Sequence, residues 1–118
     1  MGEIEAQLAA DRGDRRASVA KSNEVIGIHE RLVALAGEAP GARRSMASAL
    51  RTSAGNRYNL QDFAGACTEW RRTLATYRLL ESRGQLSDFD RKNGLPETIG
   101  YIGDICDGAK PRSQWPEI

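Results

Sequence analysis

The chain is 118 residues long, 40% hydrophobic and 28% charged, and its formal net charge is +1. This composition is typical of one soluble globular domain, and no apolar run approaches the length of a transmembrane helix, so the sequence excludes a membrane-spanning protein. Only 6% of the residues are aromatic. We therefore expect a core built mainly from Leu, Ile, Val and Ala, and a stability that depends in part on a partner or on self-association.

Helical periodicity dominates the chain, and the first helix is expected over residues 3–36. Its second half carries apolar residues at intervals of three and four, which places them on one helix face: Val25, Ile28, Leu32 and Leu35. The segment 11–16 is polar on all sides and contains Gly13, so a break or a frayed turn is expected there. Gly37 can cap the helix, and Pro40 prevents it from continuing.

Two further helices are expected in the middle of the chain. The second covers residues 42–54 and turns four apolar residues to one side: Met46, Ala47, Leu50 and Ala54. The third, over residues 60–83, has the strongest pattern, an apolar seam that repeats every four and three residues: Phe63, Cys67, Trp70, Leu74 and Tyr77. Asn59 is the expected N-cap of this helix, and Gly84 is expected to end it.

The C-terminal part of the chain predicts two short helices joined by a turn at Gly94. They cover residues 87–93 and 96–107, and the second turns three residues inward: Ile99, Ile102 and Cys106. The pair resembles a helix-turn-helix unit, with Leu86 and Phe89 inside its first helix and Leu95 in its turn. However, the turn is one residue short, and the face that would read DNA carries Glu97 and Asp104, which phosphates repel. We therefore expect the general geometry of two helices joined by a glycine turn.

Together these elements predict an all-α fold, a small bundle of four to five helices with a looser N-terminal arm and an extended C-terminal tail. The expected organisation is a helical arm over residues 1–20, a bundle over residues 21–108 and a tail over residues 109–118. A chain of this length has room for one modest core.

No pattern in the sequence indicates an enzyme, a cofactor or a metal site. His29 is the only histidine, and the two cysteines, Cys67 and Cys106, form no CxxC pair. A zinc site could not be completed from these three residues without carboxylates. No glycine-rich phosphate-binding motif occurs. The first sixteen residues lack the apolar segment of a signal peptide, so we expect a cytoplasmic protein in which both cysteines are free thiols.

The most informative pattern is the distribution of charge. No acidic residue occurs between Gly41 and Gln61, whereas the segment 84–108 is acidic. We therefore expect a partner-binding surface made of six arginines and two aromatic anchors: Arg43, Arg44, Arg51, Arg57, Arg71, Arg72, Tyr101 and Trp115. The alternative for the arginines is a solvated face, or docking on the acidic segment of the same chain or of a neighbour.

The function expected from these patterns is that of a non-enzymatic protein–protein interaction or assembly module, which binds an acidic partner surface or self-associates. The alternative is a nucleic-acid-binding regulatory protein that uses the arginine patch around residues 43–57. Such a protein would lose affinity steeply as the salt concentration rises, because each neutralised phosphate releases counterions. An apolar protein interface would respond little to salt.

Overall fold

The computed structural model describes residues 3–36 and 40–118, and for residues 3–15, 18 and 36 it describes the backbone alone. The regular elements of this part of the chain are all helical: α1 (Glu3–Ala36), α2 (Pro40–Asn59), α3 (Phe63–Ser82), a π-helical turn (Asp90–Gly94), α4 (Leu95–Tyr101), a second π-helical turn (Ile102–Cys106) and a 3-10 turn (Arg112–Gln114). The predicted all-α fold is confirmed. Gly37, the expected cap of the first helix, lies outside the described residues.

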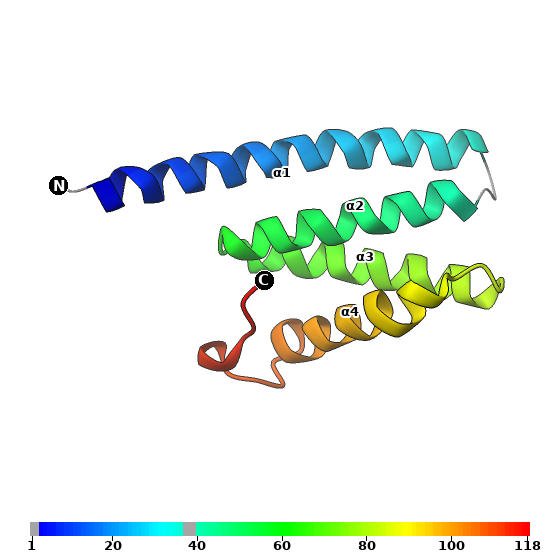
Figure 1. Ribbon diagram of the computed structural model, residues 1–118. Helices are drawn as coiled ribbons and strands as arrows, with labels where there is room; N and C mark the ends of the chain where they lie inside the picture. Colours follow the sequence, from blue (N-terminus) through cyan, green and yellow to red (C-terminus); the bar gives the residue numbers. More distant parts are fainter. Residues whose placement is uncertain (1–2, 37–39) are drawn as a thin grey trace.

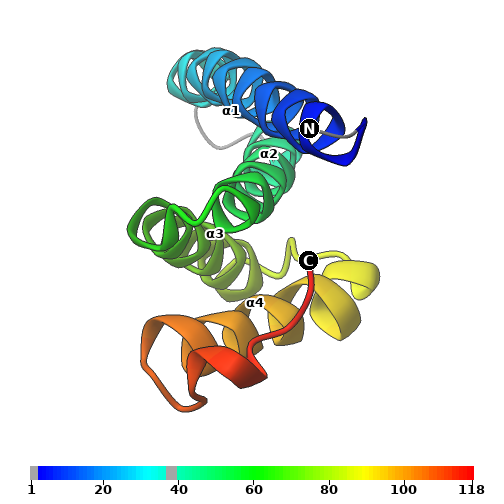
Figure 2. The same ribbon diagram turned by 90° about the vertical axis from the view of Figure 1, so that its left-hand side faces the viewer.

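The four helices lie in a row, and each packs mainly on its neighbours in the sequence (Figure 1, Figure 2). α2 and α3 form an antiparallel hairpin at the centre, with α1 on the far side of α2. The final helical segment, residues 88–106, lies on the far side of α3. α1 has 34 residues and α2 has 20, so α1 is about 20 Å longer. Its N-terminal part extends beyond the end of α2 (Figure 1).

The core lies on both sides of α3, in two apolar clusters. One cluster gathers around Tyr77 and Leu80, and the other around Trp70. Both clusters combine residues of α2, α3 and the final helical segment, and the buried alanines Ala54 and Ala66 allow the helices to approach closely. The seam predicted for the third helix is therefore confirmed at its centre, where Trp70 and Tyr77 are fully buried.

Three expected boundaries in the first half of the chain are wrong. The backbone of α1 is helical through residues 11–16, so the expected break is absent. α2 continues to Asn59, and the turn that follows it contains Gln61 with a positive φ of 65°. The N-cap of α3 is Asp62, whose side chain accepts a hydrogen bond of 3.0 Å from the backbone N–H of Gly65. Asp caps a helix as well as Asn does, and the longer α2 moves the turn by three residues.

The cysteines are not free thiols, because Cys67 and Cys106 form a disulfide with their Cα atoms 5.7 Å apart. Cys67 lies in α3, and Cys106 ends the second π-helical turn. The bond joins positions 39 residues apart, which become neighbours only when the final helical segment packs on α3. Sequence spacing therefore gave no sign of it. The disulfide fixes the end of this segment beside the Trp70 cluster.

The expected turn at Gly94 is also absent, because the backbone is helical without interruption over residues 88–106. Gly94 has helical dihedral angles, and the N–H of Leu95 bonds to the carbonyl of Asp90 in a π-helical pattern. The π-helical turn is followed by Pro96, which lacks an N–H and would disturb a regular α-helix. One continuous helix cannot form a helix-turn-helix unit, so the resemblance does not extend to the structure.

The two π-helical turns also change which residues face inward. Ile99 was expected in the core but is 43% exposed, while Thr98 is buried and donates a hydrogen bond of 2.8 Å to the carbonyl of Gly94. Phe89, expected inside the first short helix, is also exposed, but it precedes both π-helical turns, so they do not account for its orientation. Each π-helical turn contains more residues than an α-helical turn, so an α-helical period assigns the wrong face beyond it.

Gly94 allows the final helix to approach α3 closely, and its replacement by alanine is expected to destabilise the fold by about 1–3 kcal/mol. A Cβ atom there would lie 2.8 Å from the Tyr77 hydroxyl oxygen and 3.1 Å from an Asp90 carboxylate oxygen. Gly100→Ala is the matched control, because a Cβ at Gly100 meets nothing within 4 Å. It should be neutral or stabilise by up to about 1 kcal/mol. Urea denaturation of both variants would measure the difference, and equal effects would contradict the close approach.

Candidate interaction surfaces

Most arginines of the predicted patch form ion pairs inside the chain, and Arg57 is the most enclosed example. Its guanidinium donates hydrogen bonds to the carboxylates of Glu69 and Asp62 and, at 2.9 Å, to the side-chain oxygen of Asn23. Glu69 is buried in α3, and a buried carboxylate needs a charged partner to offset its loss of hydration. Arg57 therefore stabilises the fold and does not face outward.

Three other arginines of the patch are paired in the same way. Their partners are acids from elsewhere in the chain: Arg51 bonds Glu97 at 3.3 Å, Arg71 bonds Asp107 at 3.3 Å and Arg72 bonds Glu30 at 3.0 Å. Arg51 also donates to the Tyr77 hydroxyl at 3.4 Å. Arg51 and Arg71 thus bind acids in the segment 84–108 of their own chain. Docking of the arginines on this acidic segment was one of the alternatives considered from the sequence.

Arg43 and Arg44 differ from these four, because neither forms an ion pair with a residue that the structure describes. Arg44 is exposed, and its Nε donates to the carbonyl of Pro40 at 3.4 Å. Arg43 is half-buried, and its Nε is buried without a hydrogen-bond partner among the described residues. The part of the predicted patch without an ion pair to a described residue is therefore limited to two adjacent residues near the start of α2.

Trp115, one of the two expected aromatic anchors, packs on the body of the protein. Its ring centroid lies 4.9 Å from that of Phe63 and 6.3 Å from that of Tyr58, and its indole N–H donates to the carbonyl of Lys110 at 3.0 Å. The guanidinium of Arg112 covers the same Phe63 ring at 4.8 Å. Trp115 holds the C-terminal tail against the start of α3.

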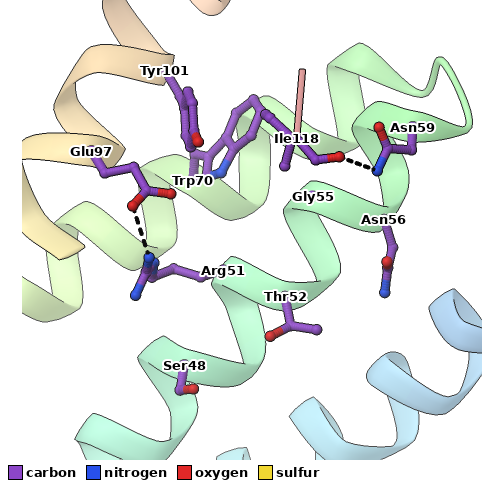
Figure 3. A pocket seen from close by; sticks show the side chains of 10 residues that line it. All are labelled: Ser48, Arg51, Thr52, Gly55, Asn56, Asn59, Trp70, Glu97, Tyr101 and Ile118. Carbon is purple, nitrogen blue, oxygen red and sulfur yellow. Dashed lines mark hydrogen bonds and ion pairs between the residues drawn. The ribbon is translucent and has the colours of Figure 1, made fainter. Parts of the chain in front are cut away.

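Tyr101, the other expected anchor, lies at the edge of a cavity of about 420 Å³ between α2, α3 and α4 (Figure 3). Its ring lies 5.0 Å from that of Trp70. Burial raises the pKa of the Tyr101 hydroxyl, and the nearby Glu97 carboxylate raises it further. Because Glu97 also pairs with Arg51, the charges lining this part of the cavity are already balanced.

The last residue of the sequence lies on the opposite wall of this cavity. Its backbone oxygen accepts a hydrogen bond of 3.0 Å from the side-chain amide of Asn59, as Figure 3 shows for Ile118. The Ile118 side chain comes within 3.2 Å of where a Cβ of Gly55 would be. The chain itself therefore closes one side of the cavity.

The surface that differs most from the sequence-based prediction lies on α1. Its expected apolar face is not the one that packs on α2, because α2 contacts the side that carries the buried residues Ser22 and Ile26. The four residues of the expected apolar face form a stripe on a neighbouring side, which we call the α1 stripe: Val25, Ile28, Leu32 and Leu35. Ile28 is 48%, Leu32 is 45% and Leu35 is 86% exposed, while Val25 is half-buried at the edge.

A groove of about 400 Å³ runs beside the α1 stripe, between α1 and α2. From α1 it is lined by Lys21, Ser22, Val25 and His29, and from α2 by small residues: Ser45, Ser48, Ala49 and Thr52. The Nδ1 atom of His29 is buried there without a hydrogen-bond partner among the described residues. In the sequence, the small residues of α2 were the one indication of this surface. Their side chains are too short to cover the side of α1.

Within the described residues, no group of three or more His, Cys, Asp and Glu could hold a metal ion. In the same part of the chain, none of the helices combines the length and the apolar character needed to cross a membrane. Comparisons with protein-family models, with curated proteins and with solved structures gave no match.

Proposed function

We propose that this protein is a non-enzymatic protein–protein interaction or assembly module, and that the α1 stripe is its contact surface. The observation that supports the proposal is the joint exposure of Ile28, Leu32 and Leu35 on one face of one helix. Single exposed apolar residues are common, but a contiguous apolar surface marks a binding site. Full burial of one such side chain contributes about 1.5–3 kcal/mol to association.

Because most arginines of the patch form ion pairs inside the chain, we do not propose the arginine patch as the contact surface. Arg51, Arg57, Arg71 and Arg72 would each have to give up an acid of their own chain before they could bind an acidic partner. Nucleic-acid binding through these arginines stays a prediction. It too would require each of them to give up an acid of its own chain. Arg43 and Arg44 alone offer few phosphate contacts, so such binding would be weak.

The cytoplasmic location expected from the sequence also stays a prediction. The Cys67–Cys106 disulfide weighs against it, because disulfides persist mainly in oxidising compartments and are rare where thiols are kept reduced. The proposed interaction does not depend on the location, since the α1 stripe is remote in sequence from both cysteines.

Affinity purification of the tagged protein from its source cells, after nuclease treatment, tests the proposal with two matched variants. Leu32→Asp places a charge in the centre of the α1 stripe, and Arg44→Glu reverses an exposed charge of the arginine patch. We expect the wild type and Arg44→Glu to retain the same proteins at low and at high salt. Leu32→Asp should lose them, because burial of an unpaired carboxylate is unfavourable.

The opposite pattern would favour the alternative function. Nucleic acid that copurifies without nuclease treatment, and that is lost at high salt and in Arg44→Glu, would assign binding to the arginine patch. Retention of all partners by Leu32→Asp would remove the α1 stripe as the contact surface. Circular dichroism of both variants provides the control for folding, and both substituted side chains are exposed.

A further inference from the structure

We infer that the groove between α1 and α2 binds a small organic anion, a carboxylate or a phosphate ester with an apolar body, and that Lys21 contacts its charged group. The inference goes beyond the proposed function and does not depend on it. The volume of the groove, about 400 Å³, lies in the range of pockets that bind small organic molecules. Such pockets combine an apolar surface with a few polar groups that orient the ligand.

Every polar side chain that lines the groove can donate a hydrogen bond. The donors are one lysine, one histidine and four hydroxyl groups: Lys21, Ser22, His29, Ser45, Ser48 and Thr52. No acidic side chain belongs to the lining, and this includes Glu24, the acid nearest to Lys21 in the sequence. The groove is therefore complementary to a ligand that carries negative charge and accepts hydrogen bonds.

The donors of the groove are not used by the part of the chain that the structure describes. Lys21 forms no ion pair with a described residue, and none of the four hydroxyl groups forms a hydrogen bond with one. On α3, by contrast, Thr68, Thr73 and Thr76 each donate to the carbonyl four residues earlier, at 3.0, 2.8 and 2.9 Å. Hydroxyl groups inside helices commonly form this bond. The hydroxyl groups of the groove remain able to bind a ligand.

His29 gives a second, independent indication of a ligand. It lines the groove, and its Nδ1 atom is buried without a hydrogen-bond partner among the described residues. Buried polar atoms are hydrogen-bonded in nearly all proteins, because an unsatisfied one costs free energy. A polar group of a ligand in the groove would supply this partner.

The order of the residues along the groove specifies the shape of the ligand. Lys21 and His29 lie two helical turns apart on α1, about 12 Å along the helix axis. Between these two ends, Val25 and Ala49 give the middle of the groove an apolar surface. A ligand with its carboxylate or phosphate at Lys21, an apolar body in the middle and a polar group near His29 would contact all three parts.

An NMR titration that follows the backbone amide shifts of the whole chain, at physiological ionic strength, tests the inference with three probes. Phenyl phosphate and benzoate carry the two candidate anionic groups, and benzyl alcohol is an uncharged probe of similar size. We expect at least one anion to shift the amides on both walls of the groove saturably, around Val25 and Ala49, while benzyl alcohol shifts them little. The anion that binds more tightly identifies the charged group of the ligand as phosphate or carboxylate.

Two variants with the same change of charge complete the test. Lys21→Gln should weaken the binding of the anion about tenfold, because it removes a hydrogen bond between two charged groups. Lys92→Gln removes an exposed lysine of the first π-helical turn and should leave the affinity unchanged. Both lysines are exposed, and the spectra recorded without probe show whether the variants are folded.

Three results would overturn the inference. The first is that neither anion shifts the amides of the groove saturably up to its solubility limit. The second is that benzyl alcohol binds as tightly as the anions, which would leave the charge without a role. The third is that Lys21→Gln binds the anion as tightly as the wild type does. Each result leaves the proposed function unaffected, because that function is tested through Leu32.

Discussion

Replacement of Trp70 by alanine is expected to lower the free energy of unfolding by about 3–5 kcal/mol, as deletion of large core aromatics does. Trp70 is 2% exposed, and its ring centroid lies 5.0 Å from that of Tyr101 and 5.9 Å from that of Tyr58. The deletion leaves a cavity between α2, α3 and the final helical segment. The disulfide beside it limits the movement that could close this cavity. Urea denaturation followed by circular dichroism measures the change.

Phe89→Ala is the matched control for the loss of an aromatic side chain, because Phe89 is exposed. Its effect should lie within about 0.5 kcal/mol, as for most surface substitutions. A loss of less than about 1 kcal/mol for Trp70→Ala would mean that Trp70 does not fill the core. The arrangement of α2, α3 and the final segment around it would then be wrong.

Loss of the disulfide is expected to have the second large effect. The bond closes a loop of 39 residues, and the chain-entropy relation gives a stabilisation of about 4 kcal/mol for a loop of this length. The double variant Cys67→Ser/Cys106→Ser should therefore unfold at a lower urea concentration than the oxidised wild type. The expected loss is a large part of the stability of a small domain.

Titration of thiols in the unfolded protein provides the direct check on this prediction. Without a reducing agent no thiol should react, and after reduction both Cys67 and Cys106 should react. Two reactive thiols in freshly purified protein would contradict the disulfide and would support the cytoplasmic location. A reduced protein as stable as the oxidised one would show that the bond adds nothing to the fold.

The parts of the fold that could be predicted from the sequence depend on local patterns. The seam through Trp70 and Tyr77 repeats over several helical turns, so its period identifies the buried face of α3 without knowledge of the rest. Gly84 ends this helix as expected, and its positive φ of 66° explains why glycine suits that position. The α2 face with Ala47 and Leu50 was predicted for the same reason.

The features that could not be predicted depend on contacts between distant segments. Gly94 resembles a helix end in the sequence, but it allows the final helix to pass close to Tyr77. The arginines resemble a free basic patch, yet Arg51 and Arg71 bind acids that are far away in the sequence. The α1 stripe has a core-like period, but α2 packs on another side of α1. Periodicity identifies an apolar face and leaves open what covers it.

The measurement that most directly tests whether the α1 stripe is a contact surface is affinity purification of the tagged protein from its source cells, with the wild type beside Leu32→Asp. The account predicts that the wild type retains partner proteins that Leu32→Asp loses, because Leu32 is exposed at the centre of the stripe. Retention of the same proteins by the wild type and by a folded Leu32→Asp variant would contradict it.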